Sequence, residues 1–69
     1  MATETVTVYQ DDDKQYRWTR KNNGNHEVVG ASSEAYHNFS DAVENAKHIN
    51  GDIGKTHDGT ELQYIFNRP

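Results

Sequence analysis

The stretch FSDAVENAKHI, residues 39–49, sets the fold class because the apolar pattern of the chain changes its period here. Apolar side chains recur at i, i+3, i+4, i+7 and i+10, the spacing of one face of an amphipathic helix. Ser40 is a natural N-cap and Asn50-Gly51 is a stop signal, so we predict a helix over residues 40–49. Such a short helix needs a sheet to pack against. The apolar face consists of Phe39, Ala42, Val43, Ala46 and Ile49.

The segments on either side of this helix have the two-residue period of strands, with prominent β-branched and aromatic side chains. Three consecutive aspartates, residues 11–13, favour a turn through side-chain bonds to the backbone. The dipeptide Asn23-Gly24 tolerates the positive φ angles of a type I′ hairpin turn. We therefore predict one α+β domain over residues 1–69, an antiparallel sheet covered by the helix. The expected strands span residues 5–10, 15–21, 26–32 and 60–66.

The composition leaves little material for a core in a chain of 69 residues. There are five Val, three Ile, one Leu and two Phe, and no Cys. Domains of this size are marginal in stability and usually need disulfides, a metal or a partner chain. Since disulfides and thiolate metal sites are excluded, we expect the chain to complete its core by pairing with a second copy.

The net charge and the N-terminal residues bear on the location of the protein in the cell. The first eight residues are polar and lack the apolar segment of a signal peptide, and no apolar run approaches a membrane span. We therefore expect a cytoplasmic protein without membrane contact. The net charge of −4 is also compatible with a halophilic cytoplasm.

Several spaced motifs run through residues 9–18 and 28–49. A Tyr precedes an Asp by two residues, an aromatic-Arg-Trp triplet and an Asn-Gly turn follow, and Ser, Glu and Tyr then alternate before the helix. Together these motifs resemble the YegP-like family of small proteins of unknown function. The motif residues are Tyr9, Asp11, Tyr16, Arg17, Trp18, Asn23, Gly24, Val28, Val29, Gly30, Ser32, Glu34 and Tyr36, continued in the helix by Ser40, Ala42, Val43 and Ile49.

The resemblance implies a β-β-β-α-β unit that shares one sheet with a second unit and exchanges its C-terminal strand. It implies no established activity, substrate or cofactor. Because this chain holds a single unit, the resemblance implies a homodimer. Its interface is expected on the last strand, at Leu62, Tyr64 and Phe66.

The function that follows is that of a small non-catalytic interaction or structural module, dimeric and open to an unknown protein partner. The alternative is a nucleic-acid-binding accessory protein that uses Arg17, Arg20 and Lys21 with sheet aromatics, since such residues meet phosphates and stack bases. The acidic net charge makes nucleic acid the less favoured partner. Strand alternation also places Arg20 on the face of Tyr16 and Trp18, with Arg17 and Lys21 on the other.

Other short patterns lack the context that their chemistry needs. The aspartates 11–13 lack the alternation and distal Glu of an EF-hand. Residues 51–56 end like a phosphate-binding loop, but no strand precedes them and no helix follows. No serine lies in a nucleophile turn. We expect no enzymatic activity, no metal and no cofactor, and we interpret His26, His37, His48 and His57, about ten residues apart, as surface side chains.

Overall fold

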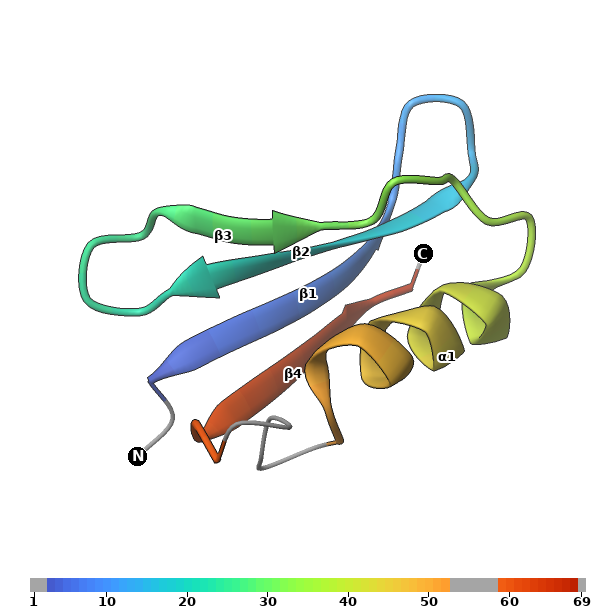
Figure 1. Cartoon of the computed structure of the whole chain (residues 1–69). Coiled ribbons are helices and arrows are strands. Elements are labelled where there is room, and N and C mark those ends of the chain that lie inside the picture. The colour runs from blue at the N-terminus through green and yellow to red at the C-terminus, as the bar shows by residue number, and fades with distance from the viewer. Residues whose placement is uncertain (1–2, 53–58, 69) are drawn as a thin grey trace.

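The computed structural model describes residues 3–52 and 59–68 and shows a four-stranded sheet with one helix on one face, an α+β fold (Figure 1). The strands lie in the order β3-β2-β1-β4, so β3 and β4 form the two edges. Among the described residues, no helix covers the opposite face of the sheet. The elements are β1 (Glu4–Gln10), β2 (Tyr16–Asn22), β3 (Val28–Ala31), α1 (Phe39–Asn50) and β4 (Leu62–Asn67).

The sheet is mixed, and the prediction of a wholly antiparallel sheet is wrong. β1 and β2 pair antiparallel, as do β2 and β3, whereas β4 runs parallel to β1. Parallel strands need a crossover of about a dozen residues or more, usually a helix. Here α1 lies between β3 and β4 in the chain and crosses from one edge of the sheet to the other, so that β4 starts at the same end as β1.

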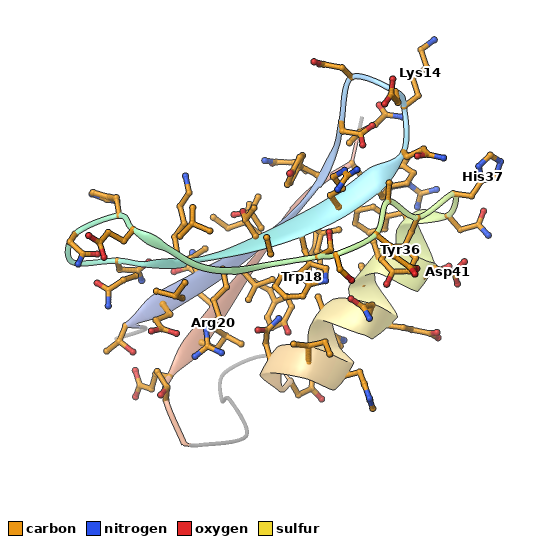
Figure 2. The ribbon with its side chains drawn as sticks, turned by 45° about the horizontal axis from the view of Figure 1, so that its top comes forward. Lys14, Trp18, Arg20, Tyr36, His37 and Asp41 are labelled. Carbon is orange, nitrogen blue, oxygen red and sulfur yellow. The ribbon has the colours of Figure 1, made fainter. Side chains whose placement is uncertain are left out.

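The core lies between α1 and the covered face of the sheet. Val8 on β1 pairs with Trp18 on β2, so alternation places both side chains on the face that α1 covers. Figure 2 shows Trp18 between β2 and the helix. Ala42 and Ala46 are fully buried, and their small side chains let the helix approach the sheet closely. The buried apolar residues of the described chain are Val6, Val8, Trp18, Ala42, Ala46 and Leu62.

The N-terminal end of α1 differs from its predicted form, whereas the predicted stop at Asn50-Gly51 is confirmed. The N-cap is Asn38, not Ser40, and its side chain makes no capping bond to the backbone. At the other end Gly51 closes the helix with φ 108°, and its N–H donates to the Lys47 carbonyl. The prediction that Ile49 belongs to the packed face is wrong, because 55% of it is exposed and the next residue, Asn50, is buried.

The β2–β3 hairpin also differs from the predicted type I′ turn. The left-handed conformation falls on His26, with φ 60°, and not on Gly24. The Asn22 side chain accepts the Gly24 N–H at 2.8 Å, and the Asn22 carbonyl accepts the His26 N–H at 2.8 Å. These bonds favour a wider loop than two residues, which delays β3 until Val28.

Candidate functional site

The structure separates the three cations that the sequence brought together as a possible nucleic-acid contact. Val6 pairs with Arg20, and Arg20 therefore shares the covered face with the core (Figure 2). Arg17 and Lys21 have the opposite parity on β2 and lie on the open face. A surface formed by all three does not exist in this chain, and Arg20 drops out of the candidate site.

Arg20 instead belongs to a polar network under the C-terminal end of α1. Its guanidinium forms an ion pair with Glu4, and both side chains are more than four-fifths buried. Nη1 of Arg20 also donates to Oδ1 of Asn50 at 3.4 Å, and Nδ2 of Asn50 donates to the Ala46 carbonyl at 2.9 Å. Among the described residues, no buried side-chain nitrogen or oxygen lacks a hydrogen bond. This network explains why a buried Asn replaces Ile49 at the packed face.

Asp11 organises the turn that joins β1 to β2. One carboxylate oxygen accepts the backbone N–H groups of Asp13 and Gln15, at 2.9 and 3.0 Å. The other accepts Nε of Arg17 at 2.9 Å. The bond from the Gln15 backbone, together with Arg17, holds the pKa of the Asp11 carboxyl below its ordinary value. Asp11 therefore stabilises the turn that the three consecutive aspartates predicted.

Most other motif residues also make structural contacts. Nε1 of Trp18 donates to Oδ1 of Asn45 at 2.8 Å, which ties β2 to the helix. The Trp18 N–H donates to Oγ of Ser32 at 3.3 Å. Tyr16 and Tyr36 exchange backbone hydrogen bonds at 2.7 Å, which anchors the segment that leads into α1. Asn23 and Gly24 lie in the hairpin loop, Glu34 is exposed, and Tyr9 is half-buried on the open face.

The outer edge of β4 is the first of two surfaces that could receive a partner. The Glu61 carbonyl accepts the backbone N–H groups of Thr3 and Glu4, so it points toward β1. Because backbone groups alternate in direction along a strand, those of Leu62, Tyr64 and Phe66 point to the outer edge. Their side chains face α1, where Leu62 is buried and Phe66 is 42% exposed. The predicted interface residues therefore offer backbone groups at the edge, not a side-chain patch.

The open face of the sheet is the second surface. Thr5, Thr7 and Tyr9 of β1 share it with residues of the neighbouring strands, according to the strand register. A notch at one end of the sheet is lined by Tyr9, Gln10, Asn67 and Arg68. The notch lies where the parallel strands β1 and β4 both end. From the neighbouring strands, Arg17, Thr19, Lys21, Gln63, Ile65 and Asn67 lie on the open face.

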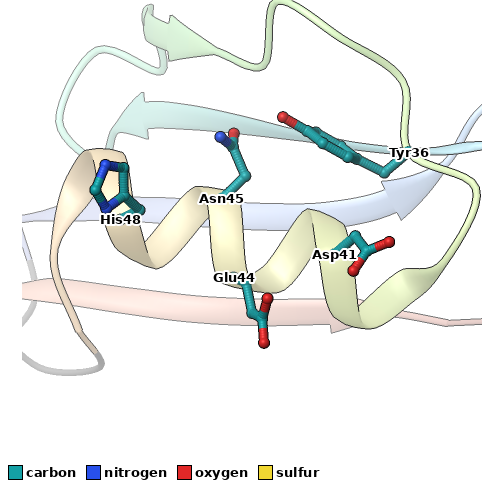
Figure 3. A pocket seen from close by; sticks show the side chains of 5 residues that line it. All are labelled: Tyr36, Asp41, Glu44, Asn45 and His48. Atoms are coloured by element: carbon teal, nitrogen blue, oxygen red, sulfur yellow. The ribbon is translucent and has the colours of Figure 1, made fainter.

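A shallow groove runs beside α1, next to the Tyr36 ring (Figure 3). Its lining combines two carboxylates with His48 and the Tyr36 ring, and the Asn45 side chain in it is already bonded to Trp18. No group of three or more His, Cys, Asp or Glu able to hold a metal occurs in residues 3–52 and 59–68. His57 and most of the loop-like stretch 51–56 lie outside the described residues. The lining residues are Tyr36, Asp41, Glu44, Asn45 and His48.

Comparisons with known proteins add no relative. No family model matches the chain, and no curated protein and no solved structure matches it. Within the described ranges, no helix has the length and apolarity needed to cross a membrane.

Proposed function

We propose that this protein is a small non-catalytic interaction module that acts as a homodimer through β4. The observation that carries the proposal is the form of this edge strand. β4 is six residues long, pairs in regular register with β1, and contains neither a charged residue nor a proline. Edge strands of soluble proteins are normally protected by such residues, by bulges or by being short, and a long plain edge is a site for pairing with another chain.

The other edge of the sheet provides the contrast. β3 has four residues, and its register with β2 shifts between Arg20 and Lys21. A short, irregular strand is a poor template for a further strand. A strand from a second chain is therefore expected to pair with β4 and not with β3.

The apolar exposure at β4 supports the same partner. Ile65 is 39% exposed and Phe66 is 42% exposed, one on each face of the strand. Burial of apolar area contributes roughly 25 cal/mol per Å², so covering these side chains would strengthen a core that has six buried apolar residues in the described part of the chain. A second copy brings the same surface and covers both at once.

The resemblance to the YegP-like family supports an exchanged arrangement, in which β4 of each chain pairs with β1 of the partner. The register suits either arrangement, because Leu62 would fill the same position under α1 in its own chain or in the partner. Edge-to-edge pairing of two β4 strands is the other geometry. Edge-to-edge pairing uses the outward backbone groups of Leu62, Tyr64 and Phe66, whereas exchange uses the groups that face β1, those of Gln63 and Ile65.

The dimer is tested by light scattering of the 69-residue chain at micromolar to millimolar concentration. We expect a mass twice the 7.9 kDa of the chain. Ile65→Lys places a charge on the β4 edge and should give a folded monomer. The matched control is Val28→Lys, because Val28 is an exposed aliphatic residue on the other edge strand and should leave the dimer intact. A folded wild-type monomer, or equal effects of both variants, would contradict the proposal.

A designed disulfide separates the two geometries. Thr7 and Ile65 are register partners on the open face, so the chain with Thr7→Cys and Ile65→Cys has its two thiols on adjacent strands. The chain has no other cysteine. Strand exchange predicts a covalent dimer on a non-reducing denaturing gel, and edge-to-edge pairing predicts an internally closed monomer band.

A further inference from the structure

The chain contains two Asn-Gly dipeptides, and the structure places them in opposite surroundings. In such a dipeptide the side-chain amide of Asn lies next to a main-chain nitrogen that is not shielded by a Cβ of its own residue. Asn23-Gly24 lies in the exposed loop between β2 and β3, whereas Asn50-Gly51 is buried at the end of α1. The same two groups therefore occur once in contact with water and once enclosed.

The buried pair, Asn50-Gly51, is held by bonds to the helix and to the sheet. The Gly51 N–H donates to the Lys47 carbonyl at 2.9 Å, which completes the last turn of α1. Nδ2 of Asn50 donates to the Ala46 carbonyl at 2.9 Å, and its Oδ1 accepts Nη1 of Arg20 at 3.4 Å. Because the nitrogen and the amide are bonded to different groups of the fold, they can react with each other only if the end of α1 opens.

The exposed pair, Asn23-Gly24, is held in a way that favours a reaction between its two groups. Oδ1 of Asn23 accepts the hydroxyl of Thr5 at 2.6 Å, in a bond that lies at the surface. A donor on this oxygen polarises the amide and stabilises the negative charge that the oxygen acquires when the amide carbon is attacked. The Gly24 N–H donates to Oδ1 of Asn22 at 2.8 Å, an exposed side-chain bond that water can replace without unfolding of the chain. The amide is thus polarised, and a local change releases the nitrogen.

We infer that Asn23 is a site of spontaneous deamidation in the folded protein and that Thr5 is the positioning residue of this reaction. The main-chain nitrogen of Gly24 loses its proton to hydroxide and attacks Cγ of Asn23, which lies in the same chain segment. The bond between these two atoms forms, the bond from Cγ to the side-chain nitrogen breaks, and that nitrogen leaves as ammonia after taking a proton from water. Water then opens the resulting succinimide at either carbonyl and gives Asp or isoaspartate. One water is consumed and one ammonia is released, with no oxidant or reductant.

The reaction changes the hairpin loop in two ways. Either product adds one negative charge to a chain whose net charge is −4, and isoaspartate also adds a methylene to the main chain. The Asn23 N–H donates to the Thr3 carbonyl at 2.9 Å, so both changes fall where the loop is tied to the segment that leads into β1. All of the reacting groups belong to one chain, and the inference therefore does not depend on the dimer.

The test follows the folded 69-residue protein by mass spectrometry during incubation at mildly alkaline pH. After digestion, deamidation adds about 1 Da to the peptide that contains the converted residue, and labelling with isoaspartyl methyltransferase identifies isoaspartate. We expect Asn23 to convert at least about tenfold faster than Asn50, because Asn50 reacts only when α1 opens. In denaturant the two rates should differ less than about threefold, since both residues are then exposed and both precede Gly.

Substitutions of Thr5 separate polarisation of the amide from support of the strand. Thr5→Ser retains the hydroxyl and should keep the rate within about twofold, whereas Thr5→Val retains the shape and should slow conversion about tenfold through the lost hydrogen bond. A merely structural role would give the opposite order, because Val supports a strand better than Ser. Gly24→Ala should slow conversion at least about tenfold by shielding the nitrogen. Its Cβ would lie 3.1 Å from Oδ1 of Asn22, the end of a side chain that can shift.

Three results would overturn the inference, with circular dichroism establishing that each variant is folded. The first is that Asn23 stays intact in the folded protein while it converts in denaturant, which would mean that the loop protects it. The second is equal conversion of Asn23 and Asn50 in the folded protein, which would leave no role for their surroundings. The third is a rate in Thr5→Val equal to or above that of the wild type, which would leave no role for the hydroxyl.

Discussion

The two ends of α1 are held to the sheet by different kinds of interaction. At the N-terminal end, the Phe39 ring lies 5.4 Å from Tyr16 and 6.0 Å from Phe66, both edge-to-face. At the C-terminal end, the contacts are the Arg20–Glu4 ion pair and the hydrogen bonds of Asn50. A small core is thus extended by aromatic packing on one side and by a satisfied polar network on the other.

The difference determines how each end responds to change. Aromatic packing loses free energy in proportion to the area and contacts removed, and salt has little effect on it. A buried ion pair contributes little beyond a hydrophobic replacement of the same shape, but the loss of one partner leaves the other charge buried. The polar end therefore specifies the position of α1, and the aromatic end contributes more of its stability.

The largest effect is expected at the aromatic end. Phe39→Ala removes the ring that joins Tyr16 to Phe66 and should lower the free energy of unfolding by about 3 kcal/mol, the low end for Phe truncations because Phe39 is half-buried. Denaturant unfolding followed by Trp18 fluorescence measures it. Phe39→Leu, which retains apolar volume, should lose about 1 kcal/mol. A loss under about 1 kcal/mol in the Ala variant would place the stability of α1 elsewhere.

The next effect is expected at the polar end. Arg20→Ala leaves Glu4 and Asn50 without their partner and should lower the unfolding free energy by about 2 kcal/mol, less than for a fully buried pair. The control is Arg20→Met combined with Glu4→Gln, which removes both charges and should recover about half of that loss. If the double variant is less stable than Arg20→Ala, the ion pair itself stabilises the fold and the comparison between the ends fails.

Local patterns in the sequence predicted the elements of this fold but not how their ends are completed. The alternation on β1 and β2 placed Val6, Val8 and Trp18 under the helix, and the structure shows them there. The same alternation placed Arg20 on that face, which conflicts with the hypothesis that Arg20 joins Arg17 and Lys21 in one nucleic-acid-binding surface. The partner of Arg20 was not visible, because Glu4 is 16 residues away and Asn50 is 30 residues away.

The errors have the same origin. Ile49 fits the apolar spacing of the helix, but burial of a helix residue also depends on which side chains of the sheet lie beneath it. Arg20 lies beneath the last turn, and it bonds to Asn50. Asn50 is therefore buried there and Ile49 is exposed. Asn23-Gly24 favoured a two-residue turn, but the side chain and carbonyl of Asn22 hold a longer loop. The direction of β4 depends on where the crossover through α1 ends. Tyr9 and Arg68 were missed as surface residues because they meet only across the β1–β4 pair.

Tyr64 on β4 takes part in both kinds of interaction that hold α1, the aromatic packing and the polar contacts. Its ring stacks on Phe66 at 5.8 Å, and its hydroxyl donates to the Gly51 carbonyl at 2.6 Å. Tyr64→Phe retains the stacking and removes the hydrogen bond, so we expect a loss of about 1 kcal/mol in denaturant unfolding. Tyr64→Leu, which removes both, should lose about twice as much. Equal losses in the two variants would assign the whole contribution to the hydroxyl.

The same hydroxyl gives the polar end a dependence on alkaline pH. Burial, and then the Asp52 carboxylate, raise the pKa of Tyr64 from 10.0 to about 12. Since the folded state holds this proton more tightly, its stabilisation is complete below pH 10 and is lost as the pH rises from 10 to 12. Phenolate absorbance should show a late titration step, and Tyr64→Phe should remove that step. A wild type without a late tyrosine would contradict this assignment.

The smallest effect is expected at the outer margin of the aromatic end. The Arg68 guanidinium lies 5.4 Å from the centre of the Phe39 ring, and Arg68 is exposed, so the cation–π contact contributes about 0.5 kcal/mol. Arg68→Gln should lower the unfolding free energy by that amount, whereas Arg68→Lys should retain part of it. In the Phe39→Leu background the same Arg68→Gln change should have no effect, because the ring is gone. A double-mutant cycle with a coupling near zero would show that Arg68 stabilises the chain through its charge and not through Phe39.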